Sequence, residues 1–97
     1  MFDEIKQRLG IHDAVKTYDK QIQSLIEYAL YDMEESGVSK DTLDSESAPV
    51  INCVAMFCEW HMEPDPTIAE AYHKMYDGAI FRLSINDAAN TTGGVET

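Results

Sequence analysis

Two cysteines and three histidines are the residues best suited to bind a metal ion or to act as nucleophiles in this chain. Cys58 and His61 have a spacing that places two ligands on one face of a helix, and Glu63 follows closely. A zinc site needs about four ligands with compatible spacing, and no second cysteine–histidine pair occurs in the sequence. The pattern therefore favours a core thiol and a helix-end histidine, and we expect no metal site and no cofactor.

Cys53 and Cys58 fall in one predicted apolar helix. Five helical residues separate them by about 140° and roughly 7.5 Å of rise, which is too far for an unstrained disulfide. Burial in such a helix raises the pKa of a thiol and suppresses its reactivity. We therefore predict two buried thiols in a reducing compartment.

Other catalytic patterns are also missing from the sequence. Residues 93–94 are both glycine, but no strand precedes them and no helix is expected after them, as a phosphate-binding loop would require. The carboxylates are expected on exposed faces, where a perturbed acid–base pair does not form. We therefore predict no catalytic residue, and the protein is not expected to be an enzyme.

The charge balance is strongly acidic, with seven basic residues against eighteen acidic ones and a formal net charge of −11. Such a surface repels the phosphate backbone, so ordinary duplex DNA binding is not expected. Carboxylates concentrate between residues 27 and 46, which indicates either a solvated surface or one that keeps a polyanion moving or imitates one. The candidate acidic surface comprises Glu27, Glu34, Asp41, Asp44 and Glu46.

The length of 97 residues allows one domain with a modest core. The longest apolar stretch, residues 50–60, is interrupted by Asn52 and Glu59 and is too short to cross a membrane. The first four residues lack the basic and apolar regions of a signal peptide. The sequence therefore predicts a cytoplasmic protein without membrane contact.

Helical patterns begin near the N-terminus. A short helix is expected over residues 3–9, with Gly10 in the left-handed position that ends it. Asp19 is a suitable N-cap for a second helix that ends near residues 36–37. Residues 38–47 are expected to form an acidic loop. The second helix has an apolar stripe with a 3.6-residue period, formed by Ile22, Leu25, Ile26, Ala29, Leu30 and Met33.

Two further helices complete the expected bundle. Pro49 opens one that is apolar nearly all round except for a strip formed by Asn52 and Glu59, so it is either central or packed on two sides, one of which can belong to another subunit. Asp65 and Pro66 start the last helix, which is expected to end at Leu83. Its predicted inward stripe is Ile68, Ala71, Tyr72, Met75, Tyr76, Ala79 and Leu83.

The fold prediction is therefore an all-α bundle of about four helices over residues 1–83, with a flexible C-terminal tail over residues 84–97. Tyr31 and Phe81 point away from the predicted core, and exposed aromatic side chains are favoured at protein interfaces. The candidate subunit interface consists of these two residues together with Asn52 and Glu59.

Several landmarks occur in an order that resembles the phage head–tail connector, or head-completion adaptor, proteins of long-tailed phages. A short helix ends in the Leu–Gly–Ile turn of residues 9–11, and Asp19 leads an amphipathic helix. Pro49 opens an apolar helix that ends in a Trp-containing segment of residues 54–61. A last helix carries Tyr72 and Leu83, so the resemblance covers about residues 4–83.

The resemblance implies a structural virion protein of the neck, made in the host bacterial cytoplasm. It implies a ring of about a dozen copies that docks beneath the portal protein after packaging and receives the next neck or tail-completion protein. DNA would pass through the ring without being bound specifically. The resemblance also makes the tail a candidate portal-docking segment, represented by Ser84, Ile85, Asn86 and Val95.

Two other classes remain open from the sequence. An acidic DNA-mimicking inhibitor, of the anti-restriction or anti-nuclease type, would need regularly spaced exposed carboxylates, and Glu27 and Glu34 lie two helical turns apart. A small regulatory adaptor protein is the other alternative.

Overall fold

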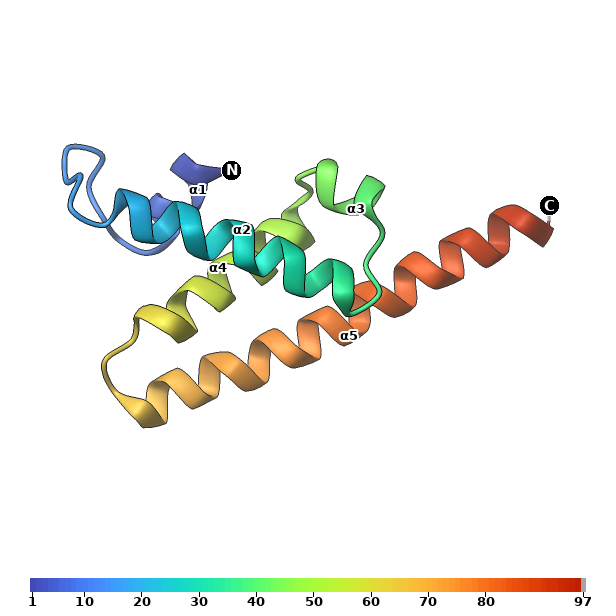
Figure 1. Cartoon of the computed structure of the whole chain (residues 1–97). Helices are drawn as coiled ribbons and strands as arrows, with labels where there is room; N and C mark the ends of the chain where they lie inside the picture. The colour runs from blue at the N-terminus through green and yellow to red at the C-terminus, as the bar shows by residue number, and fades with distance from the viewer. Residues whose placement is uncertain (97) are drawn as a thin grey trace.

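Five helices make up the part of the chain that the computed structural model describes, residues 1–96, with side chains described through Asp87. They are α1 (Phe2–Arg8), α2 (Asp19–Glu35), α3 (Lys40–Asp44), α4 (Ala48–Met62) and α5 (Pro66–Glu96). None of these residues forms a strand, so the all-α prediction is confirmed. In Figure 1, α4 and α5 form a helical hairpin and α2 lies across α4.

α4 is the centre of the core. Seven of its residues are buried, including Val50, Val54 and Phe57, and they are distributed around the helix. α2 and α1 cover it on one side and α5 covers it on another. Both apolar sides of this helix are therefore covered within one chain, and neither has to be completed by a second subunit.

Glycine ends both α1 and α2 in the same way. Gly10 has a φ of +75°, and the Ile11 N–H donates to the Lys6 carbonyl at 3.2 Å. Gly37 has a φ of +105°, and the Val38 N–H donates to the Met33 carbonyl at 3.0 Å. These bonds satisfy the last carbonyls of each helix and turn the following apolar residue back toward the core. The predicted stop at Gly10 is confirmed.

A buried lysine joins α1 to α2. Lys6 is only 2% exposed, and its Nζ lies 2.9 Å from Asp19 Oδ1 and donates to the Asp13 carbonyl at 3.1 Å. The prediction that Asp19 caps α2 is wrong, because Tyr18 occupies the N-cap position and the Asp19 carboxylate faces Lys6 instead. A buried ammonium is stable only when it is paired. The contacts of Lys6 therefore also fix residues 9–18, the segment that links α1 to α2.

The segment expected as an acidic loop contains α3. The Ser39 hydroxyl accepts a hydrogen bond from the Thr42 N–H at 3.2 Å, which caps this short helix. Val38 and Leu43 are buried and attach the segment to the core. The loop prediction for residues 38–47 is therefore wrong over α3, because two isolated apolar residues in an acidic segment were enough to anchor one turn of helix.

The inward face of α5 differs from the predicted stripe. Tyr76 and Ile80, one turn apart, are buried, whereas Ile68 is exposed and Met75 is 55% exposed. Met75 precedes Tyr76 and so lies about 100° around the helix from it. The prediction included the exposed residues and omitted Ile80, because α5 is apolar on two faces and the sequence does not show which one meets α4.

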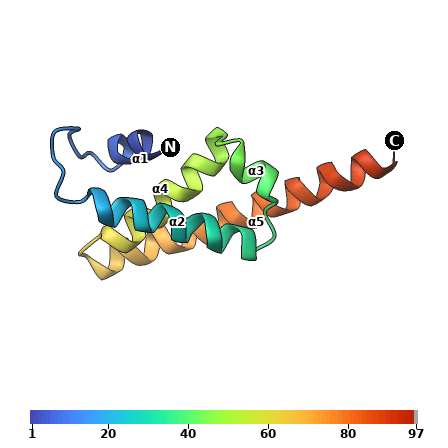
Figure 2. The ribbon, with the colours of Figure 1, turned by 45° about the horizontal axis from the view of Figure 1, so that its top comes forward.

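α5 continues beyond Leu83, where the sequence placed the end of the last helix, and it projects past the other helices (Figure 2). The Asp87 carboxylate accepts hydrogen bonds from the Ser39 N–H at 2.8 Å and from the hydroxyls of Ser39 and Thr42. The Thr42 hydroxyl and the Ser39 N–H hold the pKa of Asp87 below its ordinary value. The first turn of the predicted tail is thus attached to α3.

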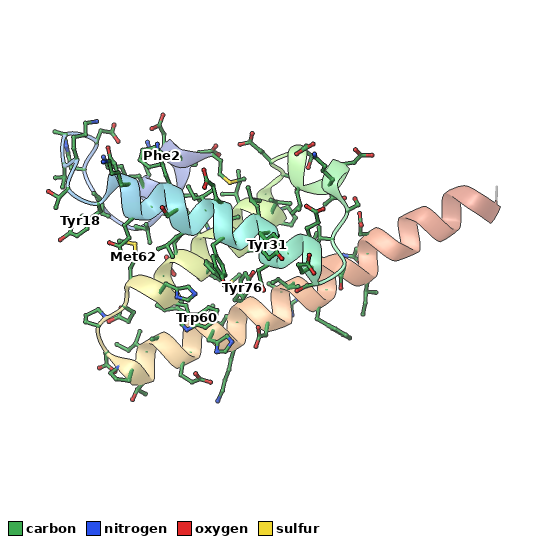
Figure 3. All side chains as sticks on the ribbon, in the orientation of Figure 1. Phe2, Tyr18, Tyr31, Trp60, Met62 and Tyr76 are labelled. Carbon is green, nitrogen blue, oxygen red and sulfur yellow. The ribbon has the colours of Figure 1, made fainter. Side chains whose placement is uncertain are left out.

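Aromatic rings fill the junction of α2, α4 and α5 (Figure 3). Half-buried Trp60 stacks on His73 with ring centroids 3.8 Å apart and also contacts His61 at 4.2 Å. The Tyr76 hydroxyl donates to Asp32 Oδ2 at 2.7 Å, and burial, followed by this bond, raises the pKa of Tyr76. The junction therefore holds α5 to both α2 and α4.

We expect Lys6→Met to lower the free energy of unfolding by roughly 2–4 kcal/mol, because the partly buried Asp19 carboxylate loses its cation. The matched control is Lys16→Met, at an exposed position between α1 and α2, which should change stability by less than about 0.5 kcal/mol. Urea unfolding followed by circular dichroism measures both. Equal stability of the two variants would contradict the structural role of Lys6.

Acid should weaken the fold partly through His61. Burial, and then the nearby charge of His73, lowers the pKa of His61. The unfolded chain therefore binds this proton more readily, so the contribution of neutral His61 is present above its ordinary pKa of about 6.5 and is lost as pH falls from there through the lowered pKa of the folded state. The urea midpoint, followed by Trp60 fluorescence, should decrease between about pH 7 and pH 5.5.

His61→Gln should make that decrease smaller, whereas His12→Gln, at an exposed position between α1 and α2, should leave it unchanged. If the wild-type protein and both variants show the same pH dependence, His61 does not contribute to it.

Candidate functional site

The predicted acidic residues are all exposed and lie on neighbouring segments. Glu27 and Glu34 belong to α2, Asp41 and Asp44 to α3, and Glu46 to the turn before α4. Glu46 has a φ of +49°, and its Oε1 lies 3.0 Å from the amino nitrogen of Met1. The structure thus brings these carboxylates to the surface, and Glu46 also makes an intramolecular ion pair.

The two aromatic residues predicted at an interface point to solvent. Tyr31 on α2 is 63% exposed and Phe81 on α5 is 65% exposed. Three further large apolar residues of α5, Ile68, Met75 and Ile85, are exposed as well. α5 therefore presents apolar side chains on its outer surface in addition to the face that packs on α4, and this outer surface was only partly recognised from the sequence.

The polar strip of α4 contacts other parts of the same chain. The Arg8 guanidinium donates to Asn52 Oδ1, which joins the end of α1 to α4. Burial raises the pKa of Glu59, while Arg8 and a hydrogen bond from Tyr72 act in the opposite direction. Asn52 and Glu59 thus have intramolecular partners, and their use at a subunit interface stays a prediction.

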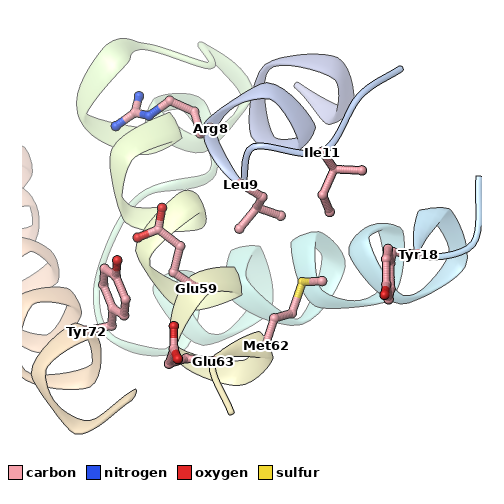
Figure 4. Close-up of a pocket in the computed structure, with 8 residues that line it drawn as sticks. All are labelled: Arg8, Leu9, Ile11, Tyr18, Glu59, Met62, Glu63 and Tyr72. Carbon is pink, nitrogen blue, oxygen red and sulfur yellow. The ribbon is translucent and has the colours of Figure 1, made fainter. Parts of the chain in front are cut away.

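A pocket of about 400 Å³ adjoins Glu59 (Figure 4). Leu9, Ile11 and Met62 form its apolar part, and Glu63 and Tyr72 add polar groups beside Glu59. The sequence pointed to Glu59 but not to the pocket. Asn52 and Glu59 stand out in the sequence as polar positions on an otherwise apolar helix. Only the fold shows that Arg8 and Tyr72 lie beside them.

A second groove, of about 310 Å³, lies between α4 and α5. Met56, Ala79 and Leu83 line it together with Arg82 and Asn86. Asn86, predicted as part of a docking tail, therefore lies in α5 beside the core. Ser84 is half-buried and its hydroxyl donates to the Phe81 carbonyl at 3.0 Å. The side chain of Val95 lies outside those that the structure describes.

The thiols are buried as the sequence predicted. Burial raises the pKa of Cys53 to about 11 and that of Cys58 to about 12, and neither forms a disulfide. Over the described residues, no group of three or more His, Cys, Asp or Glu side chains is arranged to hold a metal ion. Within the same residues, no helix combines the length and the apolar character needed to span a membrane.

Comparison with curated proteins and with solved structures gave no match. The model of the family described as phage connector protein matches residues 1–90. The match therefore includes α1 to α4 and the whole part of α5 that packs on them. It confirms the resemblance inferred from the Leu–Gly–Ile turn and the helices that follow it. Because the family model covers nearly the entire sequence, this chain belongs to the phage connector protein family.

Proposed function

We propose that this protein is a head–tail connector that docks as a ring beneath the portal and extends the DNA conduit toward the tail. The observation that carries the proposal is the family match over residues 1–90. Its place would be the virion neck, where the next neck or tail-completion protein binds to it. The family assignment favours this role over a DNA-mimicking inhibitor or a small regulatory adaptor.

The distribution of charge supports passage of DNA without tight binding. The net charge is −11, and four carboxylates of α2 and α3, those of Glu27, Glu34, Asp41 and Asp44, are exposed. A surface of this sign repels phosphates and gains no affinity from counterion release. DNA can therefore move past such a surface while making few lasting contacts.

The exposed apolar residues support contacts between neighbouring subunits. Phe57, Trp60 and Tyr76 already provide the aromatic packing inside the chain. Tyr31 on α2 and Phe81 on α5 contribute little to that core and remain available to a neighbour. Contacts of this type are individually modest, but ring closure or binding to a portal adds avidity.

The projecting end of α5 supports a docking role for the C-terminal segment. The body of the protein ends near α3, whereas α5 continues beyond it (Figure 2). A segment that extends past the body can reach a partner without disturbing the core. We propose that it grips the portal.

Tyr31→Ala and Phe81→Ala should each weaken assembly on the cognate portal by about tenfold, the loss typical of an aromatic residue at an interface. Helix content should remain unchanged, because both side chains are exposed. Val15→Ala, in the segment between α1 and α2, is the control for removing an exposed apolar side chain. Sedimentation and negative-stain microscopy would measure assembly. Normal assembly by both aromatic variants would reject these residues as interface residues.

Deletion of residues 88–97 should leave a folded protein that no longer binds the portal, and phage carrying it should accumulate heads without tails. This deletion keeps Asp87 and its hydrogen bonds to α3. Deletion of residues 85–97 also removes those bonds, so it should in addition lower the melting temperature. Normal portal binding after the shorter deletion would show that the final segment is not the docking arm.

A further inference from the structure

The pocket beside Glu59 is formed where two helices end. α1 and α4 both finish at its wall, while Tyr18 and Tyr72 flank it from the start of α2 and from α5 (Figure 4). Its volume of about 400 Å³ is within the usual range for pockets that enclose a ligand group. Segments distant in sequence therefore build one concave site.

The charges around this pocket favour a cation. Glu59 and Glu63 line it against the single positive charge of Arg8, whose guanidinium already donates to Asn52. Glu59, then burial, then Glu63 raise the pKa of Tyr72, which reflects the negative potential at its hydroxyl. The half-buried Glu59 carboxylate is only partly compensated, so a second cation would stabilise it.

The C-terminal end of α4 strengthens the same preference. The pocket lies at the C-terminal end of the 15-residue helix α4, and Glu63 is the C-cap residue. Unpaired carbonyls at a helix C-terminus carry partial negative charge that attracts cations. Phosphate groups are correspondingly disfavoured.

The apolar wall distinguishes a long side chain from a simple ion. Leu9, Ile11 and Met62 offer a surface for an aliphatic stem, which a metal ion would not use. A guanidinium can stack on a tyrosine ring and form two parallel hydrogen bonds with a carboxylate. Tyr72 and Glu59 supply these two groups within the same pocket.

We propose that this pocket binds an arginine side chain presented by a different, basic partner protein. A second copy of this chain fits less well, because the sequence contains two arginines, Arg8 and Arg82, and Arg8 already lines the pocket. The inference rests on the proposed connector function for the existence of a protein partner, and it names the chemistry by which that partner is recognised.

The test uses the full-length protein and N-acetyl-arginine methylamide as the probe. The resonances of Tyr18, Tyr72 and the Met62 methyl group should shift in NMR spectra, with a dissociation constant on the order of millimolar. Glu59→Gln and Glu63→Gln should each weaken binding by about three- to fivefold. Glu34→Gln, an exposed carboxylate on α2, is the matched control and should leave it unchanged.

N-acetyl-norleucine methylamide, which has a similar stem and no charge, should not bind detectably. Equal shifts with the two probes, or equal arginine affinity in the Glu59, Glu63 and Glu34 variants, would overturn the proposal. Circular dichroism checks that each variant is folded. If Glu59→Gln is unstable, the arginine affinity of Glu63→Gln decides the test. The probe binds without ring assembly, so failure of this site and failure of the connector function remain distinguishable.

Discussion

The need to cover α4 on several sides determines how the rest of the chain is arranged. This helix is apolar nearly all round, and leaving any broad side of it in water would forfeit much of the small core. α1, α2 and α5 meet the requirement together. Tyr76 and Ile80 orient α5 against it, and the pairing of Lys6 with Asp19 keeps α1 beside α2. The pocket next to Glu59 exists only because these helices converge on α4.

Features that depend on nearby residues could be predicted from the sequence. Gly10 ends α1 because a left-handed residue is required there, and that requirement is visible in one amino acid. The stripe of α2 is a simple 3.6-residue pattern, and Ile22, Ile26, Ala29 and Met33 are buried as expected. The outward directions of Tyr31 and Phe81 followed from the same geometry. The family could be inferred because such local landmarks occur in a characteristic order.

Features that depend on pairing between distant segments could not be predicted in the same way. The sequence shows that α5 is apolar on two faces, but only contact with α4 selects Ile80 over Met75. Lys6 looks like any surface lysine until the fold places Asp13 and Asp19 beside it. The pocket combines Arg8 and Tyr72, 64 positions apart, with Glu59. No periodicity within one helix contains that information.

The continuity of α5 has a mechanical consequence. A helix of 31 residues is about 46 Å long and behaves as a stiff rod over that distance. The first half of α5 packs on the core, and Asp87 hydrogen-bonds to α3 further along the helix. A force applied to the projecting end is therefore transmitted along the helix to these two attachments. Among the residues of α5 whose side chains the structure describes, bending is easiest at Gly78, where open space lies in place of a Cβ. Tension or torque arising at the far end would thus be felt at the aromatic junction and at α4.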